Sequence, residues 1–243
     1  MMTVVTLLWR DAERARRGLG FRPWHVRRLR DQVAQHMSRP HRFVCITDEP
    51  EWIGSLYGIP CIALDRSLVV AGKCTPRLQL FRRDAGERIG TDRILHIALG
   101  TEVVGPLDPL VERTDPLVLL RNPVHGERPR FPPFSSAVML VRSGTLPRAY
   151  DDFVPHVPLR TPWSNDACDW LSVHAPPTVA TFGPADGIHD EARLPRTWSQ
   201  AGARSALPEG ARLVTFERRR GPWDDNARAT HPWLARETTR ASA

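Results

Sequence analysis

The chain has 243 residues, of which 41% are hydrophobic and 25% are charged. This length suits one large domain or two small ones, and chains of this size bury roughly 70% of their unfolded surface. The composition excludes a wholly disordered chain, a collagen-like or coiled-coil protein and a small disulfide scaffold.

The net charge of +7 comes almost entirely from arginine, because Lys73 is the only lysine. Such an arginine bias is typical of a GC-rich genome, while the basic character favours anionic partners such as nucleotides or nucleic acid. A dedicated DNA-binding protein usually has a denser basic patch than this chain offers. The sequence has no apolar run of 18 residues, and its four cysteines lack zinc-ligand spacing. We therefore expect reduced thiols in a cytoplasmic protein with no membrane span.

The predicted elements alternate between strands and helices. Residues 3–9 form a β-branched, apolar run typical of a buried strand, and apolar residues at 26, 29, 33 and 37 mark one face of a helix that ends before Pro40. Further strands are predicted at 42–47, 59–64, 93–97, 117–120, 137–141 and 212–216, and short helices at 77–83 and 166–173. This order predicts an α/β fold in which helices flank a mixed, mostly parallel sheet. We expect a single domain over residues 1–225, followed by a polar, mobile or loosely docked tail over residues 226–243.

Several segments, taken in order, resemble one known family. Residues 41–50 (HRFVCITDEP) are close to the family's HRFVCLTDDP, and residues 76–81 (PRLQLF) resemble PKLELF. Residues 93–110 resemble RVLYLDLDTVVVGDLDPL, and residues 207–223 resemble LPDGARIVVFHGRPKPW. Shorter matches are to FNSSVM at residues 134–139 and to QDWI at residues 169–171. The chain thus resembles the GT-A glycosyltransferases, and more narrowly the small bacterial and phage proteins related to the family 8 nucleotide-sugar transferases.

The resemblance implies a Rossmann-like GT-A fold that binds a nucleoside diphosphate sugar at the carboxyl edge of its sheet. In that family, a D-x-D motif holds a manganese or magnesium ion that neutralises the departing diphosphate. This chain has Ala98-Leu99-Gly100 at those positions, Glu217 in place of the late histidine and Ser135 in place of the asparagine of FNSS. Alanine and glycine have no side-chain oxygen, so we expect no conventional metal site and no metal cofactor.

The matched positions also imply roles for individual residues. The residues expected to bind the donor are Thr6, Trp9, Asp48, Lys73, Arg77, Gly100, Glu102, Arg218 and Arg220. Ser135 and Trp170 are expected on the acceptor side, and Asp166 and Asp169 as the catalytic acids that orient or deprotonate the acceptor. Arginine and lysine suit the diphosphate because they are cations that donate hydrogen bonds. Each role has an alternative: the arginine run could be a solvated face, and the two aspartates could stabilise a helix start.

The sequence favours an enzyme that transfers a hexose-type group from a UDP- or GDP-linked sugar to a hydroxyl of a saccharide or another acceptor, with basic residues in place of the metal. One alternative is a catalytically degenerate protein that keeps the fold and acts as a binding or scaffold partner. Another is a transferase that acts on modified DNA, which the basic charge allows but no motif supports. His96, inside a predicted strand, is interpreted as a buried, hydrogen-bonded histidine rather than a metal ligand.

Overall fold

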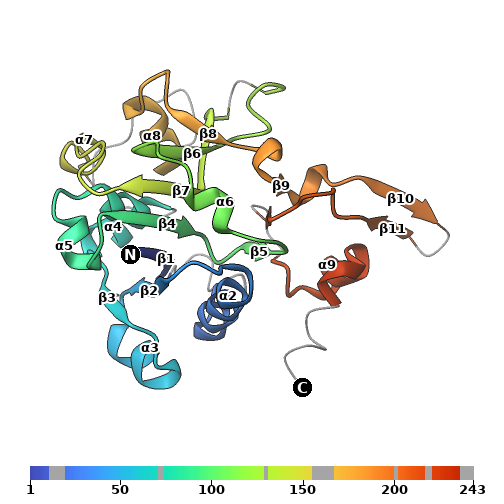
Figure 1. Ribbon diagram of the computed structural model, residues 1–243, viewed down its shortest axis with the longest axis horizontal. Coiled ribbons are helices and arrows are strands. Elements are labelled where there is room, and N and C mark those ends of the chain that lie inside the picture. Colours follow the sequence, from blue (N-terminus) through green and yellow to red (C-terminus); the bar gives the residue numbers. More distant parts are fainter. Residues whose placement is uncertain are drawn as a thin grey trace.

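A seven-stranded sheet forms the centre of the protein (Figure 1). The computed structural model describes residues 1–10, 20–70, 74–128, 131–154, 167–199, 202–216 and 221–235. The strands of the central sheet are β1 (Met2–Leu8), β2 (His41–Thr47), β3 (Cys61–Ala63), β4 (Arg93–Ile97), β6 (Leu117–Arg121), β7 (Phe134–Arg142) and β8 (Ala180–Phe182). Their order is β3-β2-β1-β4-β7-β6-β8, and only β7 runs antiparallel to its neighbours. The expected mixed, mostly parallel sheet is therefore confirmed.

Helices cover both faces of this sheet, because successive residues of a strand point to opposite sides. Val4 of β1 belongs to one apolar cluster, which α2, α3 and α6 complete, and Val5 belongs to a second, which α4, η1, α5, α7 and α8 complete. The helices are α2 (Pro23–His36), α3 (Pro50–Tyr57), α4 (Arg66–Val70), α5 (Ala85–Ile89), α6 (Asp108–Val111), α7 (Arg148–Asp151) and α8 (Ala167–His174), and η1 (Thr75–Phe81) is a 3₁₀ helix. The strands predicted at 42–47, 93–97 and 117–120 and the helix predicted from residue 24 are all present.

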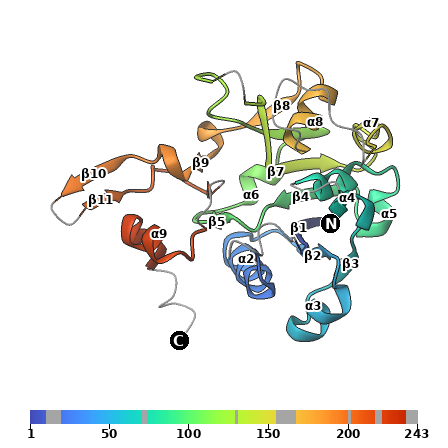
Figure 2. The ribbon, with the colours of Figure 1, turned by 180° about the vertical axis from the view of Figure 1, so that it is seen from behind.

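A smaller set of strands extends to one side of the central sheet (Figures 1 and 2). It contains a three-stranded sheet with the order β5-β12-β9 and a hairpin of β10 and β11. These strands are β5 (Thr101–Val103), β9 (Ile188–Asp190), β10 (Arg196–Ser199), β11 (Gly202–Ser205) and β12 (Leu213–Thr215). Two single-turn 3₁₀ helices, η2 (Pro184–Asp186) and η3 (Glu191–Arg193), flank β9. The strand predicted at 212–216 is therefore real, but it lies outside the central sheet.

Part of the segment after Trp223 is folded, whereas the last residues of the expected tail, 236–243, lie outside the described residues. Residues 225–235 form α9 (Asp225–Thr230) and η4 (Pro232–Ala235), and Leu234 packs with Phe216 in a third apolar cluster. His231 is buried, shares a hydrogen bond with Ser205 Oγ through Nδ1, and lies 2.8 Å from Glu191 Oε1 through Nε2. A few buried side chains thus hold a segment whose composition is mostly polar. No helix within the described ranges is both long and apolar enough to cross a membrane.

Candidate functional site

Several of the predicted site residues lie at the carboxyl edge of the central sheet. Strands β1, β2, β3 and β4 end at this edge, and the antiparallel β7 begins there, since Ile97 pairs with Val138. Trp9, Asp48 and Gly100 follow the strand ends, and Ser135 is the second residue of β7, opposite Leu120 of β6. Thr6 is fully buried within β1, below the edge. In open α/β sheets this edge is where ligands bind.

Three elements meet at Ser136, next to Ser135. The Arg77 side chain of η1 donates a hydrogen bond from Nη1 to Ser136 Oγ over 2.6 Å. The backbone N–H and the hydroxyl of Ser136 each lie 3.3 Å from the Cys168 sulfur of α8. Sequence reasoning missed Ser136 and Cys168, although Cys168 stands directly before Asp169, where the related motif has glutamine. The arrangement places a guanidinium, a hydroxyl and a thiol together at the edge of the sheet.

The remaining predicted residues of α8 lie beside this group. Asp169 is fully buried in the first turn of α8, where the helix dipole favours a negative charge. Trp170 donates its indole N–H to the Ala149 carbonyl over 2.7 Å and packs edge-on against Phe153. The indole nitrogen therefore anchors α8 to α7. The catalytic and acceptor roles of these two residues stay predictions.

His96 is a residue of β4, close enough to Arg77 to feel its positive charge. It is fully buried, and its Nδ1 is 3.1 Å from the Val5 carbonyl oxygen. Burial, together with the positive charge of Arg77, lowers the pKa of His96 to about 3. The imidazole is therefore neutral at physiological pH. This agrees with the interpretation of His96 as a buried, hydrogen-bonded histidine.

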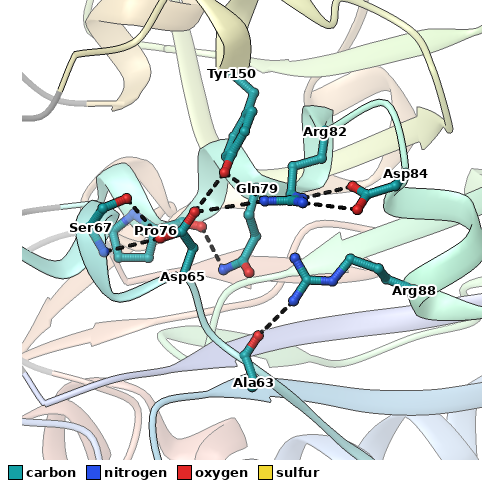
Figure 3. A network of polar contacts seen from close by, with 9 residues as sticks. All are labelled: Ala63, Asp65, Ser67, Pro76, Gln79, Arg82, Asp84, Arg88 and Tyr150. Atoms are coloured by element: carbon teal, nitrogen blue, oxygen red, sulfur yellow. Dashed lines mark hydrogen bonds and ion pairs between the residues drawn. The ribbon is translucent and has the colours of Figure 1, made fainter.

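A polar network behind η1 fixes the helix that carries Arg77 (Figure 3). The Tyr150 hydroxyl donates to Asp65 over 2.6 Å and accepts from Arg82 over 2.6 Å, and the Arg82 guanidinium lies over the Tyr150 ring. Arg82 also binds both carboxylate oxygens of Asp84. Within η1, Gln79 donates to the Pro76 carbonyl over 2.9 Å. The network connects the start of α4, the end of η1 and α7. It therefore restrains the position of η1, the helix that carries Arg77.

Replacing Tyr150 with phenylalanine is expected to lower the free energy of unfolding by about 1–2 kcal/mol, because Asp65 and Arg82 each lose a hydrogen bond. Burial alone would raise the pKa of Asp65, but hydrogen bonds from Tyr150 and Ser67 outweigh it and hold this pKa below its usual value. The stabilisation from Asp65 is therefore present at neutral pH and lost as the pH falls through its folded-state pKa. Urea unfolding at neutral pH and at about pH 3 should show the mutational loss shrinking in acid.

The matched control for this prediction is Tyr57→Phe, since Tyr57 is the other of the two tyrosines and its hydroxyl makes no hydrogen bond within the described part of the chain. Equal losses in the two variants, or a loss at Tyr150 that does not depend on pH, would contradict the assigned role of the network.

The segment Ala98-Leu99-Gly100, which the sequence resemblance aligns with the D-x-D motif, does not fit a metal ion. Ala98 and Leu99 are buried, and the Gly100 carbonyl accepts a hydrogen bond from the Phe216 N–H over 2.8 Å. Glu102 is fully buried beneath α2, where it forms an ion pair with Arg28 and accepts a hydrogen bond from Gln32 over 2.8 Å. Nor do three histidine, cysteine or acidic side chains come together as ligands anywhere in the described residues. Because Glu102 is buried and paired with Arg28, it does not belong to the proposed donor site.

An aromatic cluster borders Gly100. Trp223, from the C-terminal segment, packs on His25 with ring centroids 3.9 Å apart, and His25 stacks on Trp24 at 3.6 Å. Phe21 lies edge-on to Trp223 and reaches Gly100, where its ring would be 3.7 Å from an added Cβ. Burial lowers the pKa of His25 to about 4, so this ring is uncharged at neutral pH. The cluster joins the start of α2 to a segment almost 200 residues away (residues 24 and 223), and nothing in the sequence signals this contact.

A cavity of about 420 Å³ opens at the ends of β2 and β3. Asp48, Glu49 and Trp52 line it from the start of α3, and Leu64 and Arg66 line it from the start of α4. The Asp48 carboxylate accepts a hydrogen bond from the Arg10 N–H over 3.1 Å. This cavity holds the predicted donor residue Asp48. Four other predicted residues, Lys73, Asp166, Arg218 and Arg220, lie outside the described residues.

The sheet order, the helices on both faces and the polar carboxyl edge together define a GT-A glycosyltransferase fold. Solved structures with this fold include that of the galactosyltransferase LgtC in complex with donor and acceptor sugar analogues, with a TM-score of 0.59, 13% identity and coverage of 98% of this chain and 94% of LgtC. The structure of an active-site mutant of LgtC has a TM-score of 0.60 and 15% sequence identity, and the match covers 99% of this chain and 95% of the mutant chain.

A third similar structure is the apo form of the glycosyltransferase GlyE from Streptococcus pneumoniae TIGR4, with a TM-score of 0.58, 10% identity and coverage of 99% of this chain and 64% of GlyE. The sequence matches no protein-family model and has no significant match to a curated protein. The similarity confirms the fold that the sequence resemblance implied. The sequence identities are too low to assign the roles of residues in these proteins to residues of this chain.

Proposed function

We propose that the protein transfers a hexose-type group from a nucleoside diphosphate sugar to a hydroxyl acceptor without a D-x-D metal site. The observation that carries the proposal is a fold similarity over nearly the whole chain to LgtC, whose structure holds donor and acceptor sugar analogues. The convergence of Arg77, Ser136 and Cys168 at the carboxyl edge supports it.

In the proposed reaction, the bond from the sugar C1 to the diphosphate oxygen breaks and a bond from C1 to the acceptor oxygen forms. The diphosphate gains negative charge as it leaves, and the guanidinium of Arg77 can donate two parallel hydrogen bonds to phosphate oxygens. Lys73, Arg218 and Arg220 are the further cations that the sequence predicts for this task. The acceptor hydroxyl gives up its proton, for which Asp166 and Asp169 are the predicted bases.

Calorimetric titration with UDP- and GDP-linked sugars, with manganese and with a chelator, tests the proposal. We expect at least one nucleotide sugar to bind, with a Kd that manganese changes by no more than about twofold, because no three histidine, cysteine or acidic side chains of the described residues come together to hold the ion. Failure of every nucleotide sugar to bind would defeat the donor site. A strong dependence on manganese would defeat its metal-free form.

A non-enzymatic binding protein is the second candidate, and the absence of the D-x-D carboxylates at Ala98 and Gly100 favours it. This candidate predicts that a nucleotide sugar binds but is neither hydrolysed nor transferred. It also predicts that Asp169→Asn leaves binding unchanged. Release of the nucleoside diphosphate in the presence of acceptors, lost in Asp169→Asn, would exclude it.

A further inference from the structure

Two cysteines face each other across neighbouring strands of the central sheet. In the parallel pairing of β2 with β3, Cys45 stands directly opposite Cys61, and both side chains pack into the same apolar cluster. Neighbouring strands lie about 4.8 Å apart, which falls within the range of about 4.4–6.8 Å between the Cα atoms of disulfide-bonded cysteines. The Cys61 thiol donates to the Ile59 carbonyl over 3.2 Å, and the Cys45 thiol lies 3.9 Å from the Ile46 carbonyl oxygen. The register therefore sets the two backbones at a separation that a disulfide can span.

The two thiols differ in exposure and in acidity. Cys45 is completely buried, whereas Cys61 is partly exposed, on a strand at the edge of the sheet. The neighbouring Cys45 thiol lowers the pKa of Cys61, whereas the neighbouring Cys61 thiol and burial raise the pKa of Cys45. The thiolate is the nucleophile in disulfide exchange. Cys61 is thus suited to react first with a reagent from solvent, and Cys45 to resolve the product.

The position of the pair links it to the cavity at the end of the sheet. Two residues beyond the cysteines, Thr47 of β2 and Ala63 of β3 both line that cavity. The other two cysteines lie elsewhere, Cys74 at the start of η1 and Cys168 against Ser136. A disulfide bond between Cys45 and Cys61 would link β2 and β3 covalently, two residues before the positions at which both strands line the cavity.

We propose that Cys45 and Cys61 form a reversible redox pair that a low-molecular-weight disulfide, such as glutathione disulfide, oxidises. The Cys61 thiolate attacks one sulfur of glutathione disulfide, which gives a mixed disulfide on Cys61 and releases one glutathione thiolate. The Cys45 thiol then loses its proton and attacks the Cys61 sulfur. This step forms the Cys45–Cys61 bond and releases the second glutathione, so two protein thiols are oxidised while one disulfide is reduced. The pair does not depend on the proposed sugar transfer.

Peptide mass mapping tests this directly, because both cysteines lie in one tryptic peptide, residues 43–66, whereas Cys74 and Cys168 lie in others. The folded protein is incubated with glutathione disulfide, alkylated in denaturant and digested without reduction. We expect the 43–66 peptide to lose the mass of two hydrogens and to carry no alkyl group. Dithiothreitol should restore a peptide with two alkyl groups.

Two variants separate the steps. In Cys45→Ser, Cys61 should retain one glutathione because the resolving thiol is gone. In Cys61→Ala, Cys45 should remain unmodified while the protein is folded, because it is buried. Cys74→Ser is the matched control and should still form the bond. The proposal is overturned if the wild-type 43–66 peptide keeps both thiols, carries glutathione on both cysteines, or forms the bond only after denaturation.

Discussion

Arg77→Gln is expected to lower kcat/KM for sugar transfer by about 10²–10³-fold, the typical loss when one preorganised donor to a developing negative charge is removed. Arg77 emerges from η1 at the carboxyl edge, where its Nη1 holds the Ser136 hydroxyl over 2.6 Å. Glutamine can still donate a hydrogen bond to Ser136 but has no charge and no planar fork for a phosphate. Steady-state kinetics with the donor identified by calorimetry measures the loss, and most of it should fall on kcat.

The matched control is Arg83→Gln, a few residues further along the chain. Arg83 is 71% exposed and pairs with Asp151 on the surface over 2.7 Å, so we expect its kcat/KM to stay within about twofold of wild type. Both variants should unfold at temperatures close to wild type. Equal activity losses in the two variants, or a normal kcat/KM in Arg77→Gln, would remove Arg77 from the donor site.

Arg28→Met is expected to destabilise the protein by about 3–5 kcal/mol, because it removes a charge partner of the buried Glu102 carboxylate. Glu102 has no exposed side-chain surface, and Arg28, at 26% exposure, forms an ion pair with it. Gln32 still donates one hydrogen bond to the carboxylate, over 2.8 Å, but supplies no charge. Urea unfolding followed by tryptophan fluorescence gives the loss.

The neighbouring variant Arg27→Met is the matched control for this experiment. Arg27 is 60% exposed and faces Asp31 at 3.8 Å, an exposed helix pair worth about 0.5 kcal/mol or less. The double variant Arg28→Met with Glu102→Gln should recover much of the stability, because the buried charge is gone. A similar small loss in Arg27→Met and Arg28→Met, with no recovery in the double variant, would show that Glu102 does not need its partner.

Strong, local apolar patterns were sufficient to predict most strands of the central sheet and the long helix α2. They were insufficient for short elements such as α4 and β8, whose few residues contain too little periodicity. Pro50 at the first helical position of α3 is a signal that sequence reasoning could have used. The burial of Leu234 and His231, two residues in a polar stretch near the C-terminus, is not signalled by the local composition.

The sequence predicted some positions of the candidate site better than others, and Glu102 shows the reason. Its position beside the D-x-D segment suggested the phosphate region, whereas β5 turns its side chain under α2 to meet Arg28. Trp9, Asp48, Gly100 and Ser135 do share the carboxyl edge, because that edge follows from strand direction alone.

The amino-acid sequence alone determined most strands of the central sheet, the long helix α2, the α/β class and the lack of side-chain oxygens at Ala98 and Gly100, because periodicity and residue chemistry are local properties. Only the tertiary structure decided that Arg77 meets Ser136, 59 residues away, and that Arg28 meets Glu102, 74 residues away. The register that sets Cys45 opposite Cys61 is likewise a tertiary property. Such contacts depend on how strands pair and which face each helix covers, and packing of the whole chain selects among registers that the local sequence leaves equivalent.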